Sequence, residues 1–311
     1  MNLYGLDSAY ENSKVIVIPV PWEGTVSYGR GTADAPEAIF EASPQIDLCD
    51  PDFGPVYKQG IFMLDVPVNI KELNRKAYSG AMAVNELSAE VNGYVHAAAK
   101  KVIHDGKIPI VLGGEHSVSY GAIVAVAGKF GIRNSEFGIL HLDAHFDLRN
   151  SYEGFTFSHA SAMYNVIQDI PQIEKLVSVG VRDFCEEELA FASANKKIKF
   201  FLDNDLALAK IKGESWFDIT ERIICELPQN VWVSFDIDVL DPSLAPHTGT
   251  PVPGGLSFYE ANHLLRRITE TGRRIVGADL CEVVPGKDDE WDANVGMRVL
   301  YKLFGWICSG A

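Results

Sequence analysis

Three short stretches of this sequence place histidine and carboxylate side chains directly after apolar runs. GGEHS (113–117) follows IPIVL, DAHFD (143–147) follows FGILHL, and DID (236–238) follows VWVSF. Charges scattered by chance are disfavoured beside strands that are buried, because unpaired charge is costly there. The pattern instead indicates polar groups that are gathered at strand ends for chemistry.

The spacing within these stretches predicts which side chains point together. In an extended segment alternate residues share one face, so Asp143, His145 and Asp147 are expected to point into one site, as are Asp236 and Asp238. The two glycines of GGEHS are expected to let the backbone turn sharply and to present the histidine that follows them. Asp-Pro at 241–242 is a common way to open a turn, so we assign its aspartate no catalytic role.

The three stretches together supply two imidazoles and four carboxylates, too much negative charge for one site without cations. Oxygen ligands mixed with imidazole suit manganese or similar divalent ions, and carboxylates can bridge two of them. The five cysteines are scattered without a CxxC pair, which argues against a closed zinc-thiolate site. A two-metal site is the economical explanation. Its candidate ligands are His116, Asp143, His145, Asp147, Asp236 and Asp238.

The rest of the chain indicates an α/β fold. Continuously apolar runs, expected of strands covered on both faces, alternate with amphipathic segments such as 81–106 and 257–272. This alternation predicts a parallel sheet with helices on both sides, and we expect one domain over residues 1–311. In such a sheet ligands bind beyond the carboxyl ends of the strands. The predicted strands are 15–20, 108–113, 137–143, 175–182, 197–201, 231–238 and 274–283.

Composition narrows the function classes. The chain of 311 residues is 47% apolar and 22% charged, with a net charge of −15. That charge argues against a nucleic-acid partner and is compatible with a small cationic substrate. No apolar run is long enough for a membrane helix, and residues 1–14 lack the features of a signal peptide. We therefore expect a cytoplasmic protein with no membrane partner.

The three stretches resemble the hallmarks of the ureohydrolase (arginase/agmatinase) family, namely GG-[DE]-H-S, D-A-H-x-D and S-x-D-x-D-x-x-D-P, in the same order. The resemblance spans most of the chain. It implies a three-layer α/β/α fold with a mostly parallel, eight-stranded sheet, two Mn²⁺ per chain, and a homo-oligomer, trimeric or hexameric. It also implies that one ion is bound by His116, Asp143, Asp147 and Asp236, and the other by Asp143, His145, Asp236 and Asp238.

The resemblance further implies the roles of the catalytic groups. His159, in FSHASA, matches a proton-relay histidine, although it could merely begin a helix. Glu282, in GADLCEVVP, matches the carboxylate that pairs with the substrate guanidinium, although it could be a surface acid. Thr250, in HTGTP, matches a threonine near the substrate, or serves only its turn. Water activated by the two ions attacks the guanidino carbon, and Asp147 passes a proton to the leaving amine.

The substrate is less well determined by the sequence. Residues 147–163 and 21–43 look like the agmatinase branch, which makes putrescine and urea. Aminopropylagmatine, arginine, guanidinobutyrate and formimidoylglutamate remain alternatives. Arg149 could hold a substrate carboxylate, but an ion pair within its own loop is the more common role of arginine. His247 replaces a small residue of arginases, which leaves the pocket wall there open.

Two alternatives with a different kind of function also remain. A family member can bind its ligand without turnover, as a regulatory homologue, although all six metal positions are filled here. A metal-dependent deacetylase shares the architecture but typically uses one zinc. A metal count on the purified protein separates these cases, at about two manganese or about one zinc per chain.

Overall fold

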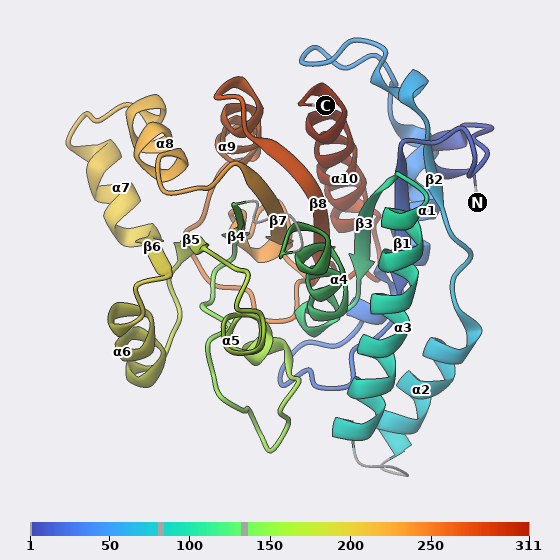
Figure 1. Cartoon of the computed structure of the whole chain (residues 1–311), viewed down its shortest axis with the longest axis horizontal. Coiled ribbons are helices and arrows are strands. Elements are labelled where there is room, and N and C mark those ends of the chain that lie inside the picture. The colour runs from blue at the N-terminus through green and yellow to red at the C-terminus, as the bar shows by residue number, and fades with distance from the viewer. Residues whose placement is uncertain (1, 80–83, 132–135, 311) are drawn as a thin grey trace.

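The computed structural model describes residues 2–79, 84–131 and 136–310. Its core is one sheet of eight strands, all parallel, in the order β2-β1-β3-β8-β7-β4-β5-β6 (Figure 1). The strands are β1 (Val15–Val20), β2 (Ile61–Met63), β3 (Ile108–Gly113), β4 (Phe137–Leu142), β5 (Lys175–Val181), β6 (Ile198–Leu202), β7 (Asn230–Asp236) and β8 (Arg274–Cys281).

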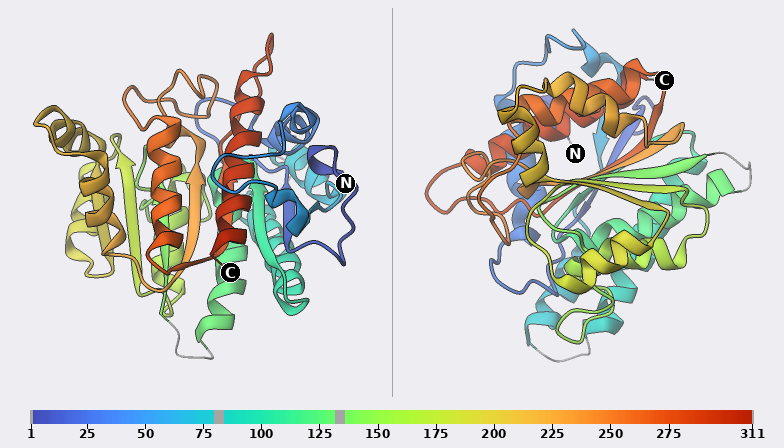
Figure 2. Two further views of the ribbon diagram at one scale, coloured as in Figure 1. Left: turned by 90° about the horizontal axis from the view of Figure 1, so that it is seen from above. Right: turned by 90° about the vertical axis from the view of Figure 1, so that its left-hand side faces the viewer.

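Helices cover both faces of this sheet, which gives the three layers seen edge-on in Figure 2. One layer packs α1 and α7–α10 against the sheet, and the other packs α2–α6. The helices are α1 (Ala35–Ala42), α2 (Val68–Ser79), α3 (Val84–His104), α4 (Ser119–Gly131), α5 (Ala162–Asp169), α6 (Glu186–Ala194), α7 (Asp203–Ile211), α8 (Trp216–Ile224), α9 (Phe258–Glu270) and α10 (Trp291–Ser309).

The strands are apolar at every position because each of them packs against a hydrophobic core on both faces of the sheet. In β1, Val15 and Val17 face the layer of α1 and α7–α10, whereas Ile16 and Ile18 face the opposite layer. All four are fully buried. Successive side chains of a strand point to opposite faces, so a strand covered on both sides needs apolar residues at every position. The α/β fold with a parallel sheet that the sequence predicts is therefore confirmed.

Several predicted boundaries differ from the observed ones. The expected strands 137–143 and 231–238 end at Leu142 and Asp236, before most of the polar residues. The short edge strand β2 was not predicted, because three residues show too little pattern. The second predicted helix begins as expected, with Ser257 capping α9 through a hydrogen bond from the Glu260 N–H. Residues 81–83 of the predicted helix 81–106 lie outside the described residues.

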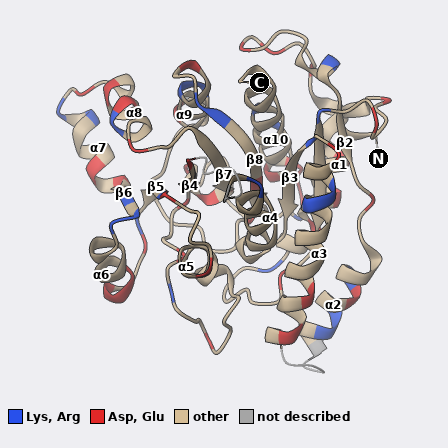
Figure 3. Ribbon diagram, in the orientation of Figure 1, with Lys and Arg blue, Asp and Glu red and all other residues tan. Residues whose placement is uncertain are grey.

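The surface carries both signs of charge. Figure 3 shows Lys and Arg interspersed with Asp and Glu over both helical layers. Of the helices in the described part of the chain, none combines the length and apolar character needed to cross a bilayer.

The four central strands bring the polar stretches together. β3, β8, β7 and β4 are hydrogen-bonded neighbours in that order, and all run in the same direction. Their carboxyl ends therefore meet at one edge of the sheet. GGEHS follows β3, DAHFD follows β4, DID spans the end of β7, and Glu282 comes directly after β8. Segments separated by more than a hundred residues in sequence thus become neighbours in space.

Candidate active site

The GGEHS segment can enter the site because its two glycines pack closely against neighbouring atoms. A Cβ on Gly114 would lie 1.8 Å from the carbonyl oxygen of Trp22, and one on Gly113 would lie 2.8 Å from Sγ of Cys281. Neither glycine has a positive φ. The backbone bends at Gly114 and Glu115, as expected, and glycine is also needed here for the close approach of other groups. His116 follows in a 3-10 turn (His116–Val118) and is buried.

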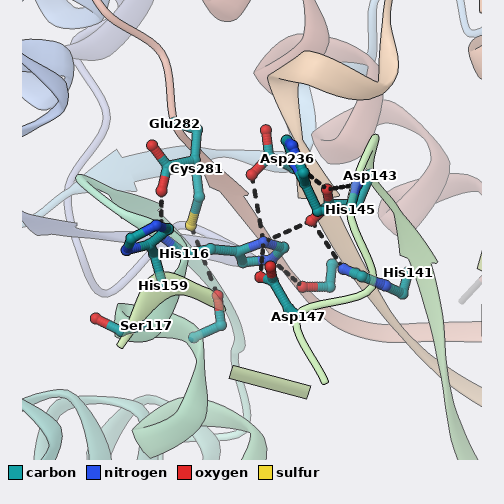
Figure 4. Close-up of polar contacts among 12 residues, drawn as sticks. His116, Ser117, His141, Asp143, His145, Asp147, His159, Asp236, Cys281 and Glu282 are labelled. Carbon is teal, nitrogen blue, oxygen red and sulfur yellow. Dashed lines mark hydrogen bonds and ion pairs between the residues drawn. The ribbon is translucent and has the colours of Figure 1, made fainter. Parts of the chain in front are cut away.

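His116 faces three carboxylates at once (Figure 4). Its Nδ1 lies 3.0 Å from Oδ2 of Asp143, 3.1 Å from Oδ2 of Asp147 and 3.3 Å from Oδ2 of Asp236. These four side chains come from three different strand ends and are all buried. They are the same four that the sequence predicts around one metal ion.

A second group of side chains lies around His145. Its Nδ1 is 3.3 Å from Oδ1 of Asp143 and 3.1 Å from Oδ2 of Asp238. The two oxygens of Asp143 therefore face different histidines, Oδ2 toward His116 and Oδ1 toward His145. Asp236 and Asp238 are linked by a hydrogen bond from the Asp238 N–H to Asp236 Oδ1, at 2.9 Å. All six predicted ligands thus converge.

The backbone route to this convergence is not the expected extended one. Residues 143–149 form an irregular loop, and Asp147 has a left-handed φ of 54°. Asp238 lies in a 3-10 turn, Ile237–Val239, instead of a strand. The alternation argument therefore predicted the right grouping for a wrong local reason. Glu282, with a φ of 63°, is a second residue of this region with left-handed backbone, a strained conformation that is common at functional sites.

The charges in this cluster are poorly compensated by the protein alone. Burial, followed by the Asp143 carboxylate, raises the pKa of Asp147 to about 6. Burial and the carboxylates of Asp238 and Asp143 raise the pKa of Asp236 well above its usual value. Asp143 is the exception: burial acts to raise its pKa, but the histidines His141 and His116 hold it well below the usual range.

This cluster fits divalent cations. The buried Oδ2 of Asp147 receives no hydrogen bond from any described residue, although buried polar atoms are normally satisfied. One imidazole N–H of His116 cannot serve three carboxylates at once. Donor atoms of His116, His141, Asp143 and Asp147 lie close enough together to hold one ion, as do those of Asp143, His145 and Asp238, so Asp143 is common to both groups. That is a suitable environment for two divalent ions.

Several buried polar residues behind the cluster were missed by the sequence analysis. His141, within β4, places Nε2 2.9 Å from Asp143 Oδ2 and Nδ1 3.2 Å from the Ser178 hydroxyl. Ser234, within β7, lies 2.8 Å from His116 Nε2 and donates to Asp279 at 2.9 Å. The available signal was a polar residue inside an otherwise apolar strand, since such a residue needs a partner when buried.

Glu282 lies in the same pocket and is not a surface acid, because only 7% of it is exposed. Its Oε1 accepts a hydrogen bond from the backbone N–H of His116, at 2.8 Å. Burial, followed by the nearby Glu115 carboxylate, raises its pKa well above the usual value. A Cβ on Gly249 would lie 2.8 Å from Glu282 Oε2, so glycine is required where that loop passes the acid.

His159 begins the 3-10 turn His159–Ser161 and also lines the pocket. Both suggested roles, helix start and pocket residue, are thus compatible. Its Nδ1 lies 3.3 Å from the Thr25 hydroxyl and its Nε2 lies 3.4 Å from the Ser27 hydroxyl. Burial, followed by the nearby His145, lowers its pKa to about 4, so the imidazole is neutral at pH 7.

The outer part of the pocket contains Arg149, Tyr152, Asp183, Glu188 and Thr250. Nε of Arg149 lies 3.5 Å from Glu188 Oε2, and its guanidinium lies 4.7 Å from the centre of the Tyr152 ring. Arg149 therefore forms an ion pair, as its residue type favoured, but its partner lies in α6 and not in its own loop. Asp183 is exposed, and its carboxylate has no partner among the described residues.

His247 is absent from this lining and instead pairs with a helix end. Its Nδ1 lies 2.7 Å from Oδ2 of Asp292, a buried residue in the first turn of α10. Asp241 accepts a hydrogen bond from the Ser243 N–H at 2.9 Å, the turn role expected of it.

Comparisons with known proteins agree with this arrangement. Residues 13–305 match the model of the arginase family. Over 303 residues the chain is 30% identical to N(1)-aminopropylagmatine ureohydrolase of Synechocystis sp., covering 96% of this chain and 90% of that protein. Over 307 residues it is 30% identical to agmatinase of Bacillus anthracis, covering 96% of this chain and 94% of that protein.

Solved structures show the same fold. Agmatine ureohydrolase of Thermoplasma volcanium superposes with a TM-score of 0.76 at 24% identity, covering 97% of this chain and 92% of that chain. Arginase from Medicago truncatula gives a TM-score of 0.74 at 25% identity, covering 95% of this chain and 88% of that chain. The predicted three-layer α/β/α architecture with an eight-stranded sheet is confirmed.

Proposed function

Because this chain belongs to the arginase family, whose members are hydrolases of guanidino groups that depend on two metal ions, we propose that it cleaves agmatine to putrescine and urea with two manganese ions. The observation that supports the proposal is a single pocket lined by His116 and His145, by the buried acid Glu282 and by the exposed carboxylate of Asp183. Both histidines contact the shared carboxylate of Asp143.

The residues around the two histidines would hold the ions. His116, Asp143, Asp147 and Asp236 would bind one, and Asp143, His145, Asp236 and Asp238 the other, with Asp143 and Asp236 common to both. When bound, two divalent cations lower the pKa of a water molecule enough for it to act as a nucleophile near neutral pH. Oxygen-rich ligands mixed with imidazole support manganese over zinc.

The protein's own groups would do the rest of the chemistry. Glu282 is buried with a raised pKa, so a cationic guanidinium beside it stabilises its ionised form and is held in place. Asp147 is near enough to the cluster to take up a proton from the attacking water and deliver it to the leaving amine. His159, neutral and at the pocket wall, would exchange protons with solvent. Water and the guanidino compound thereby give urea and a free amine.

The rim favours a substrate with a cation at its far end. Arg149 is already paired with Glu188, so it is not free to hold a carboxylate. Asp183 lines the same pocket, is exposed, and remains an unpaired negative charge among the described residues. A substrate ammonium is attracted there, whereas the carboxylates of arginine, guanidinobutyrate and formimidoylglutamate are repelled. Aminopropylagmatine also ends in a cation, and the relative from Synechocystis sp. bears its name, so it is the second candidate.

A parallel assay decides among these substrates. Manganese-loaded protein is offered agmatine, aminopropylagmatine, arginine, guanidinobutyrate and formimidoylglutamate, and release of urea or formamide is measured. We expect agmatine to give the highest kcat/KM, followed by aminopropylagmatine. Fastest turnover of arginine or guanidinobutyrate would reject the substrate assignment. Absence of turnover with all five, in protein that binds two ions, would favour a regulatory homologue.

A further inference from the structure

Glu115 is a buried carboxylate that the reaction described above does not use. It is fully buried and has no ion-pair partner among the described residues. Its side chain accepts three hydrogen bonds: from the Thr25 N–H at 2.7 Å, the Thr25 hydroxyl at 2.7 Å and the Ser117 hydroxyl at 2.5 Å. Burying a carboxylate without a cation is costly, so this arrangement calls for a role. Its principal partner, Thr25, contacts His159, which lines the pocket.

The hydroxyl of Thr25 lies between Glu115 and His159. Its oxygen is 2.7 Å from Glu115 Oε1, 3.0 Å from the backbone nitrogen of His159 and 3.3 Å from His159 Nδ1. A hydroxyl has one proton and two lone pairs, and the proton of Thr25 is donated to Oε1 of Glu115. The oxygen of Thr25 must then accept both hydrogen bonds from His159, one from its backbone N–H and one from Nδ1.

This assignment fixes the tautomer of the histidine. If the Thr25 oxygen accepts from Nδ1, that nitrogen must carry the ring proton, and Nε2 of the neutral ring carries the free lone pair. Nε2 lies near the Ser27 hydroxyl, and both residues line the pocket. Tyr152 packs edge-on against the same ring, with centroids 5.8 Å apart. The ring is thus held from two sides with its basic nitrogen on the pocket side.

The segment that carries Thr25 is itself fixed independently of substrate. Glu115 donates its backbone N–H to the Trp22 carbonyl at 2.8 Å. Glu23 Oε2 accepts from the backbone N–H groups of Gly31 and Ala33, at 2.7 and 3.2 Å. The threonine hydroxyl is therefore in place before any ligand arrives, as a positioning group has to be.

From this geometry we propose that Thr25, oriented by Glu115, is a positioning residue that holds His159 as the Nδ1–H tautomer with Nε2 directed into the substrate pocket. The inference rests on the proposed function for the catalytic value of that nitrogen, but the tautomer itself does not depend on turnover. In hydrolases of other folds, a carboxylate that is hydrogen-bonded to the catalytic histidine holds it in the correct tautomer. Here the hydroxyl of Thr25 lies between the carboxylate of Glu115 and the ring of His159.

The variants are chosen to separate positioning from simple support of the loop. Thr25→Val removes the hydroxyl with little change of shape, and Thr25→Ser restores it. Thr32→Val is the matched control: Thr32 is a fully buried threonine of the same segment whose hydroxyl bonds to the other loop carboxylate, Glu23, at 3.2 Å. Thermal melts and manganese content are measured first. If Thr25→Val does not fold, Thr25→Ala replaces it.

The kinetic arm is a double-mutant cycle with His159→Asn. We expect Thr25→Val to lower kcat for agmatine at least about tenfold, a part of the roughly 10²–10⁴-fold that positioned proton transfer contributes, with KM changed less than about twofold. Thr25→Ser should recover most of the loss, and Thr32→Val should show none. In the His159→Asn background Thr25→Val should cost nothing further. An equal loss in both backgrounds would overturn the proposal.

The second arm needs no activity. Long-range ¹H–¹⁵N spectra of metal-free protein labelled at histidine report which ring nitrogen is protonated, and His159→Asn identifies the signal. We expect a protonated Nδ1 in the wild type and in Thr25→Ser, and a mixture of tautomers in Thr25→Val. A wild-type ring protonated on Nε2, or a spectrum that Thr25→Val leaves unchanged, would overturn the proposal. If no guanidine is hydrolysed, the proposed function fails, and this arm still tests the tautomer.

Discussion

The carboxylate of Glu282 accepts a hydrogen bond from the backbone N–H of His116 at 2.8 Å. The group that would receive the substrate guanidinium is thus attached to the residue that would bind a metal ion, and the spacing between them is set by the backbone. Both are held at the ends of neighbouring strands, β8 and β3. Because the contact is to the backbone of His116, small motions of the His116 ring leave it intact.

This attachment predicts the effect of Glu282→Gln. Glutamine keeps the shape and still accepts from the His116 N–H through its amide oxygen, so the metal content should be unchanged. The charge that pairs with the guanidinium is lost, and we expect kcat/KM for agmatine to fall about a hundredfold or more, as when a strong electrostatic contact in a transition state is removed. Metal analysis and steady-state kinetics on the same preparation check both parts. Unchanged kinetics would remove Glu282 from the mechanism.

The position of Asp143 predicts which substitutions weaken both metal sites and which weaken only one. Its two oxygens face different histidines, so Asp143→Asn should weaken both metal sites. Among the histidines of the site, Asp238 lies within ion-pair distance only of His145. Asp238→Asn should therefore weaken only one metal site. Titration calorimetry with Mn²⁺ on metal-free protein distinguishes the two patterns. In wild-type protein, Mn²⁺ at 100 times its Kd should raise the free energy of unfolding by about 2.7 kcal/mol per site.

The rim predicts a change of substrate preference. Asp183→Asn removes the unpaired charge at the opening, and we expect the ratio of kcat/KM for agmatine over guanidinobutyrate to fall about tenfold, which corresponds to about 1.4 kcal/mol. Glu186→Gln is the matched control, since Glu186 is an exposed acid of the neighbouring helix α6 outside the pocket lining. An equal change in both variants would point to the overall charge of the protein instead of a contact at the rim.

The His247–Asp292 pair predicts a pH dependence of stability. A hydrogen bond to Asp292 and the charge of that carboxylate raise the pKa of His247. A raised histidine pKa contributes stability that is fully present below the unfolded value, about 6.5, and is lost as pH rises through the folded value. The difference in urea midpoint between wild type and His247→Asn should therefore be larger at pH 5.5 than at pH 9. It should also shrink in high salt, because His247 is half exposed. A difference that grew with pH would contradict this assignment.

The sequence alone was enough to predict a parallel sheet and six side chains that converge at its edge, because apolar runs and the polar residues that follow them are local features. Strands β1 and β3 have the predicted bounds, since continuous apolar runs bordered by polar residues mark them clearly. The conformation of residues 143–149 was not predictable in the same way, because the left-handed φ of Asp147 is imposed by the surrounding structure. His141, Ser234 and Thr25 were missed for a related reason. The partners of Ser234 and Thr25 are distant in sequence, as is the Ser178 partner of His141, and only the fold brings these pairs together.

Other predictions concern matters outside this fold. The oligomeric state, the cytoplasmic location and the treatment of residues 1–311 as one domain stay predictions, as does the identity of the metal. Arg149 illustrates what coordinates add. Its residue type was compatible with two roles, and the 3.5 Å contact with Glu188 favours one of them.

The pocket draws on both the segment of Ser27 and the residue Glu282, which follows the strand β8 near the end of the chain. During synthesis on a ribosome, the nascent polypeptide therefore cannot assemble this centre until residue 282 has emerged. Even then β8 must still insert between β3 and β7. A product that ends before β8 would lack both Glu282 and a central strand of the sheet, so it would not form this pocket.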